Sequence, residues 1–301
     1  MNRNWKYIKF HLYMYPYIHK SIFYSYIVHS LSNFLWFCFD FHYLKMKFIF
    51  GRARLTKLKQ LDISKSNEDT FHSIVMDTFD TACSTKVKMG GQYILGCHAM
   101  DGHKYVCMDD LVMDFKNKEC VVYSFGIRDD WAFEDMMASF GCKVYAYDPT
   151  IETPTFKYPN MKFKKIGLSG EPKDGIYKTL SEIISENGHS DTKISYLKMD
   201  IEGSELHGLR KWLESGSLAN VQQIAMEYHV NGPPFTRKES IPDFLATLRD
   251  LQTQDNFRIF NWEANSCWKN VEGQGKRKGE ENALAEIVLK RVNPQTDCSK
   301  T

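Results

Sequence analysis

Short apolar runs alternate with segments of helical periodicity through the chain beyond residue 100. The runs are rich in Val, Ile, Tyr and Phe and have the length of buried strands, while the segments between them place apolar side chains on one helical stripe. We therefore expect seven strands, at CVVYSFG (120–126), KVYAYD (143–148), MKFKKIGL (161–168), ISYLKMD (194–200), VQQIAMEYHV (221–230), FRIFNWEA (257–264) and ALAEIVLKRV (283–292). The helices predicted between them cover residues 131–140, 176–188, 204–216 and 240–251.

Strands that alternate with helices of this length specify an α/β fold with a mainly parallel sheet. No helix separates the last two strands, so we expect an antiparallel terminal hairpin there, with a long loop over residues 265–282. Upstream of the sheet, residues 68–84 have the pattern of an amphipathic helix, and Asp101-Gly102 predicts a turn beside a short strand or hairpin.

The first 60 residues differ from the rest in charge and aromatic content. They carry ten Lys/Arg against one acid, a charge of +9, whereas the remaining 29 basic and 36 acidic residues give −7. Seventeen of the 42 aromatic residues lie in the first 50 positions, and the run 21–39 approaches the ~20 residues of a membrane helix. Serines and His29 interrupt that run, so a signal anchor, an interfacial segment and an unfolded leader all remain as interpretations.

We accordingly divide the chain into a basic aromatic leader (1–60) that is a candidate for membrane association, a helical extension (61–100) and the main domain (101–301). A mildly acidic main domain argues against nucleic acid as a partner. The pattern leaves compartment and oligomeric state open.

The eight cysteines include no Cys-x-x-Cys pair, so we expect no structural zinc site. Cys120 and Cys142 lie beside strand-like runs and are interpreted as buried thiols. Cys83, Cys97 and Cys107 lie in a loop-rich region, where an oxidising compartment would permit a disulfide.

In an open parallel sheet, ligands bind beyond the carboxyl ends of the strands, so the strand-end residues are the candidates for chemistry. The first strand ends in Ser124-Phe125-Gly126, a single-glycine turn that lets a ligand approach the backbone. The second ends in Asp148-Pro149, and Asp148 follows Gly126 by 22 residues, the spacing at which an acid accepts hydrogen bonds from a ribose. The alternative is that Asp148 caps the following turn.

The densest group of charges follows the fourth predicted strand, where Asp200 and Glu202 precede a helix that Ser204 opens. Glu227 and His229 close the next strand on one face, because side chains alternate with a period of two. If the two strands are neighbours, these four side chains line one pocket suited to general-base work. They are also acceptable ligands for a hard cation, but the spacing is not diagnostic and we expect no dedicated metal. The alternative is that they cap a helix and a strand end.

With these residues, the chain resembles the FkbM-type (Methyltransf_21) branch of class I S-adenosylmethionine-dependent methyltransferases, closest to the animal methyltransferase-like protein 24 group. Three segments carry the resemblance, 120–149, 194–216 and 221–229, with support from DGHKYVCMDDL (101–111) and FNWEAN (260–265). The most specific motif is Lys-x-Asp-x-Glu-Gly-x-Glu at 198–205. The resemblance implies a Rossmann-like sheet of about seven strands, mostly parallel with an antiparallel terminal strand, and helices on both faces.

The resemblance also implies S-adenosyl-L-methionine as cofactor and methylation of a hydroxyl on a small molecule or glycan. It places the cofactor near Ser124, Phe125, Gly126, Asp148, Pro149, Asp200 and Glu202, and the catalytic groups at His229, Asp200 and Glu227. We regard His229 as the first candidate base, because its unperturbed pKa of ~6.5 suits proton removal from a hydroxyl.

The first turn departs from the usual pattern, which has an acid and further glycines; Asp129 and Asp130 are candidates to supply that acid. A catalytically degenerate fold that serves as a binding module is therefore the main alternative. A nicotinamide dehydrogenase is the other alternative, although its Gly-x-Gly-x-x-Gly turn is absent.

Overall fold

The computed structural model describes residues 62, 82–96, 98–229, 241–265 and 284–292. The leader, most of the predicted helix at 68–84 and the predicted loop at 265–282 lie outside these residues, apart from Asn265. Within them, no helix combines the length and apolar character needed to cross a bilayer.

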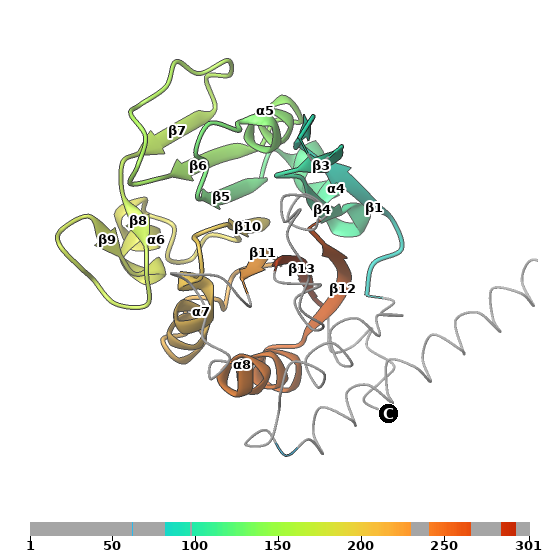
Figure 1. Ribbon diagram of the computed structural model, residues 1–301, viewed down its shortest axis with the longest axis vertical. Helices are drawn as coiled ribbons and strands as arrows, with labels where there is room; N and C mark the ends of the chain where they lie inside the picture. Colours follow the sequence, from blue (N-terminus) through green and yellow to red (C-terminus); the bar gives the residue numbers. More distant parts are fainter. Residues whose placement is uncertain (1–61, 63–81, 97, 230–240, 266–283, 293–301) are drawn as a thin grey trace, which may run out of the picture. The chain divides into compact units, whose positions relative to one another are not determined.

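A seven-stranded sheet forms the centre of the described domain, in the order β12-β13-β11-β10-β5-β6-β7 (Figure 1). Its strands are β5 (Val121–Phe125), β6 (Lys143–Tyr147), β7 (Met161–Lys164), β10 (Tyr196–Met199), β11 (Gln223–His229), β12 (Phe257–Ala264) and β13 (Leu284–Arg291). The pairings from β7 to β11 are parallel, and β13 is antiparallel to both β11 and β12. The predicted mostly parallel sheet with an antiparallel terminal hairpin is confirmed.

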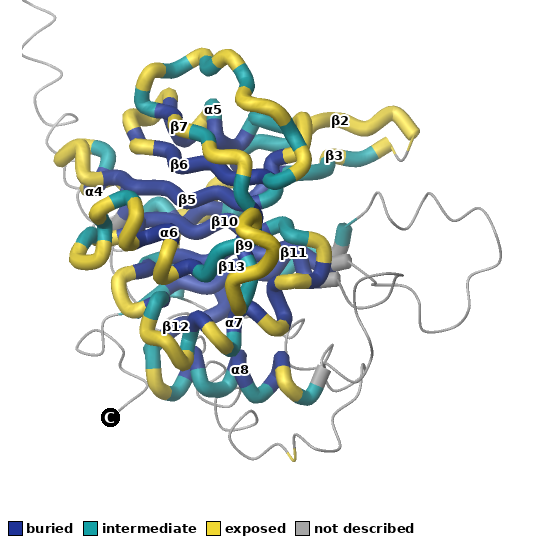
Figure 2. The backbone as a smooth tube through the Cα atoms, turned by 90° about the vertical axis from the view of Figure 1, so that its left-hand side faces the viewer, coloured by how far each residue is buried: buried dark blue, intermediate teal, exposed yellow. Residues whose placement is uncertain are grey.

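Helices cover both faces of this sheet, because its central strands bury side chains on both sides. Tyr123 packs into one apolar cluster and its neighbour Val122 into another, as the two-residue period of a strand requires. The first cluster includes apolar side chains of α6 (Leu180–Glu186), α7 (Ser204–Glu214) and α8 (Ile241–Thr253). The second includes α4 (Met108–Asn117) and α5 (Ala132–Ser139). Figure 2 shows the buried strands between these exposed outer layers. This arrangement is a Rossmann-like α/β fold with helices on both faces of the sheet.

Three small strand pairs surround the main sheet. β1 (Lys86–Met89) pairs antiparallel with β4 (Lys104–Cys107), and β2 (Gln92–Ile94) pairs with β3 (Ala99–Asp101) in a hairpin that projects from the body in Figure 2. β8 (Gly167–Leu168) pairs with β9 (Tyr177–Lys178). The described part of the expected helical extension is therefore made of strands.

Three local expectations differ from the structure. α4 was not predicted, although its apolar residues recur at helical spacing in MDDLVMDFKN. The single strand expected at 161–168 is divided into β7 and β8. The helix expected from residue 176 begins at Leu180, because Thr179 and Glu182 form a capping box that fixes its first turn there.

The interpretation of Cys120 and Cys142 as free buried thiols was wrong, because the structure joins them in a disulfide. The two cysteines precede β5 and β6, which are neighbouring parallel strands, so their side chains meet at one edge of the sheet. A second disulfide joins Cys83 to Cys107, within the region where the sequence permitted one.

We expect the Cys120 to Cys142 disulfide to stabilise the domain by about 3 kcal/mol, since closing a loop of this length restricts the unfolded chain. The Cys120→Ser/Cys142→Ser variant should show that loss in denaturant unfolding under oxidising conditions. Wild-type protein in reductant loses both disulfides, so it should be at least as unstable as the oxidised variant. Equal stability of oxidised wild type and variant would contradict the pairing.

Candidate active site

A cleft of about 710 Å³ opens at the carboxyl ends of the central strands. Its lining comes from the segments that follow β5, β6 and β10, with further residues from β2, β11 and α7. The sheet order reverses between β5 and β10, because the chain runs outward to β6 and β7 on one side and to β11 on the other. The cleft therefore lies at the switch point where open α/β sheets bind ligands, and its volume is in the range of ligand sites.

The turn after β5 requires a glycine at the point where it comes closest to Asp200, the residue that follows β10. Gly126 has φ +74°, and a Cβ added there would lie 1.7 Å from the carbonyl oxygen of Asp200. The Gly126 N–H donates to the carbonyl oxygen of Tyr147 at 3.0 Å, which ties the turn to the end of β6 as well. Backbone from three strands thus meets at the floor of the cleft, and no other residue fits this position.

Asp148 holds the same turn through its carboxylate. Oδ2 accepts the backbone N–H groups of Ile127 at 2.9 Å and Arg128 at 2.8 Å, and Oδ1 accepts the N–H and hydroxyl of Thr150 at 2.7 and 2.6 Å. Burial acts to raise the pKa of Asp148, but these hydrogen bonds outweigh it and lower the pKa. A carboxylate offers about four acceptor positions, so this one is fully occupied. Its role toward a ribose stays a prediction, and it would require exchange of a Thr150 bond.

Ser124 faces away from the cleft and into a buried polar cluster. Its hydroxyl donates to Glu134 at 2.5 Å, and Lys198 Nζ lies 3.2 Å from the same carboxylate oxygen. Lys198 also donates to the carbonyl oxygen of Gly126 at 3.2 Å. Ser124 does not line the cleft, whereas Phe125, Gly126 and Lys198 do. Lys198 thereby connects this buried cluster to the turn after β5.

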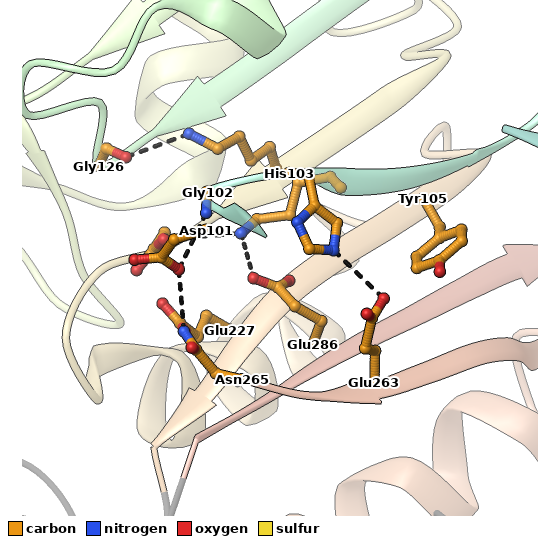
Figure 3. A network of polar contacts seen from close by, with 12 residues as sticks. Asp101, Gly102, His103, Tyr105, Gly126, Glu227, Glu263, Asn265 and Glu286 are labelled. Atoms are coloured by element: carbon orange, nitrogen blue, oxygen red, sulfur yellow. Dashed lines mark hydrogen bonds and ion pairs between the residues drawn. The ribbon is translucent and has the colours of Figure 1, made fainter. Parts of the chain in front are cut away.

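The predicted carboxylates converge. β10 and β11 are parallel neighbours, and Asp200, Glu202 and Glu227 all line the cleft. Asn265 donates to Glu227 at 2.7 Å and to Asp101 at 3.0 Å (Figure 3). His229 ends β11, but its side chain lies outside what the structure describes. Pro149 also lines the cleft, as do Asp129 and Asp130.

Several residues of the site were given no role in it by the sequence analysis: Asp101, Lys104, Glu134, Lys198, Asn265 and Glu286. Lys198 lies in the most specific motif, and Asp101, Lys104 and Asn265 lie in the two supporting segments. Glu286 had its own signal, since it is the one acid within the apolar run ALAEIVL. Charged residues in buried strands are rarely left unpaired, so that pattern indicated a buried partner.

The strand order, with its antiparallel last strand and a ligand cleft at the switch point, is that of a Rossmann-like class I methyltransferase fold. Comparison of sequences leads to the same class, since the family model Methyltransf_22, described as a methyltransferase domain, matches residues 59–274. The chain belongs to this methyltransferase family. The finer FkbM-type (Methyltransf_21) assignment stays a prediction.

Curated relatives support the assignment. The chain is 28% identical over 174 residues to human probable methyltransferase-like protein 24, covering 52% of this chain and 47% of that protein. The rat protein of the same name is 27% identical with the same coverage. The chain thus spans about half the length of the curated relatives it matches.

Solved structures show only distant similarity. A putative hemolysin from Streptococcus thermophilus matches at 14% identity and a TM-score of 0.35, covering 67% of this chain and 78% of that one. A putative tRNA (m1A22) methyltransferase from Streptococcus pneumoniae, in complex with S-adenosyl-L-methionine, matches at 13% identity and a TM-score of 0.25, covering 63% and 76%.

Gly126→Ala should destabilise the protein by roughly 2–5 kcal/mol, since the new methyl group meets backbone and the left-handed conformation is strained. Gly216→Ala is the matched control, because Gly216 has φ +73° but nothing within 4 Å of an added Cβ. It should cost about 1–2 kcal/mol. Similar losses for both variants in denaturant unfolding would contradict the close approach.

Asp148→Asn should destabilise the protein by about 1–3 kcal/mol at neutral pH, because an amide cannot accept all four hydrogen bonds. Since the pKa of Asp148 is lowered on folding, its contribution is present above the unfolded pKa of ~3.9 and disappears as the pH falls through the folded value. The difference between wild type and variant should therefore shrink on acidification. Asp129→Asn is the control, because the Asp129 side chain is 87% exposed; an equal effect there would contradict this account.

Proposed function

We propose that the cleft binds S-adenosyl-L-methionine and that the enzyme methylates a hydroxyl group of a small molecule or glycan. The observation that carries this proposal is the Gly126 turn, where backbone from three strand ends leaves a cradle that a Cβ would fill, directly beside the cleft carboxylates. The acidic character of the main domain disfavours nucleic acid as the acceptor. Membrane association through residues 21–39 stays a prediction.

The residues present fit such a donor. Phe125 and Tyr147 both line the cleft with stacked rings whose centroids are 4.8 Å apart, and they offer an apolar wall at the ends of β5 and β6. Lys198 and the Gly126 backbone lie next to them. We assign the donor to this half of the cleft, with Pro149 at its edge and Asp200 and Glu202 between donor and acceptor.

S-adenosyl-L-methionine supplies an electrophilic methyl group on a sulfonium when it is bound. The chain has to orient an acceptor hydroxyl in line with that methyl group and take up its proton as the oxygen–carbon bond forms. Asp200 and Glu227 have carboxylates on the cleft surface that can accept this proton, and His229 at the end of β11 remains a candidate. Alignment supplies most of the rate, and a base contributes about 10²–10⁴-fold.

The alternative of a catalytically degenerate binding module retains one supporting observation. The acceptor positions of Asp148 are all occupied within the protein, so the donor site depends on other contacts for the ribose. Measured affinity for S-adenosyl-L-methionine therefore distinguishes an active methyltransferase from a degenerate binding module.

Titration calorimetry of S-adenosylmethionine and S-adenosylhomocysteine into the full chain should show micromolar binding. Asp148→Ala should weaken that binding, because the turn loses its support. Absence of binding to correctly folded wild type would favour the binding-module alternative.

Transfer of a labelled methyl group to a panel of hydroxylated small molecules and glycans should identify an acceptor. On that acceptor, whichever of Asp200→Asn, Glu227→Gln and His229→Ala removes the base should lower kcat by about 10²-fold or more while donor binding persists. Glu263→Gln is the control, since Glu263 does not line the cleft. Full turnover by all three variants would exclude these residues as the base.

A further inference from the structure

Lys104 places a fully buried ammonium group beneath the cleft. It comes from β4, which is not part of the main sheet, and its side chain is 0% exposed. Nζ donates to Glu286 on β13 and lies 3.6 Å from Oδ2 of Asp200, which follows β10. Figure 3 shows Glu286 and Glu227 in the same network of polar contacts. One buried cation therefore interacts with two carboxylates, one on β13 and one directly after β10.

The surroundings keep this lysine charged. Burial acts to lower its pKa, but the attraction of Glu286, Asp200 and Glu227 outweighs burial and raises the pKa. Glu286 has the opposite balance, because burial raises its pKa to about 7 even though Lys104 acts to lower it.

A purely structural explanation is that the Lys104 to Glu286 pair attaches β4 to the sheet. Two contacts go beyond that role. Lys104 reaches Asp200, whose side chain is 21% exposed and lines the cleft. Three residues earlier, Asp101 lines the cleft and shares the Asn265 amide with Glu227. The segment 101–104 thus reaches Asp200 directly through Lys104 and is linked to Glu227 through Asn265.

We propose that Lys104 is a positioning residue that holds Asp200 ionised at the cleft, ready to accept the proton of the acceptor hydroxyl. This inference rests on the proposed function for the use of that carboxylate, but not for its ionisation. Charged groups of this cluster include Lys104, Lys198, Glu286 and Asp101. Lys198 also pairs with Glu134, and loss of Lys104 would remove a buried cation that lies 3.6 Å from Asp200 while the neighbouring acids stay in place.

The test is a carbon-13 NMR titration of side-chain carboxyls in the full chain, with the Asp200 resonance assigned by Asp200→Asn. Lys104→Met should raise the pH midpoint of Asp200 by about 1–3 units, the effect of removing a nearby opposite charge. Lys104→Arg should restore it. Lys88→Met is the matched control, because Lys88 pairs with Glu263 and does not contact Asp200. An unchanged Asp200 midpoint in folded Lys104→Met would overturn the proposal.

Lys104→Met leaves Glu286 buried without a partner, which can prevent folding. The double variant Lys104→Met/Glu286→Gln removes both members of the pair and should be tolerated better. Compared with Glu286→Gln alone, it should show the same upward shift of the Asp200 midpoint, and no difference between the two would overturn the proposal. Calorimetry with S-adenosylhomocysteine on the same wild-type sample tests the proposed function separately, since the Asp200 titration does not depend on donor binding.

Discussion

The close approach of Gly126 to the Asp200 backbone is the constraint on which the rest of the site depends. It follows from the pairing of β5 with β10 at the point where the sheet order reverses, and it requires a residue without a side chain. The hydrogen bonds of Asp148 hold the turn from the β6 side, and Lys198 holds it from the β10 side. The floor of the cleft is therefore held by contacts within the protein, which reduces the ordering that ligand binding requires.

Charge is distributed around this floor in two layers. The cleft surface carries carboxylates such as Asp200 and Glu227, buried Lys104 lies close to Asp200, and Lys198 lies at the cleft wall. Because water is largely excluded from Lys104 and Lys198, their charges act more strongly on neighbouring groups than exposed charges would. In the proposed function, such a surface accepts the proton of the acceptor hydroxyl and is compatible with a cationic sulfonium donor.

Much of this fold follows from local sequence. The runs that became β5, β6, β10 and β11 are short, apolar and β-branched or aromatic, so their strand character did not depend on tertiary context. The strand ends also identified Gly126, Asp148 and Asp200 as cleft residues. The tertiary partners of these residues could not be predicted from the sequence. Lys104, which contacts Asp200, and Glu286 are 182 residues apart and meet only in the folded sheet. The hydrogen bonds from Thr150 match the alternative that Asp148 caps the following turn, whereas those from Ile127 and Arg128 depend on the pairing of β5 with β6.

Hydrogen–deuterium exchange of the full chain, with and without S-adenosylhomocysteine, tests most directly whether the donor occupies the cleft formed by Gly126 and Asp200. Bound ligand should slow exchange in the segments that follow β5, β6 and β10, which line the cleft. The helix α8, which does not line it, should exchange at the same rate in both samples. Protection confined to another part of the chain, despite measurable binding, would contradict the account.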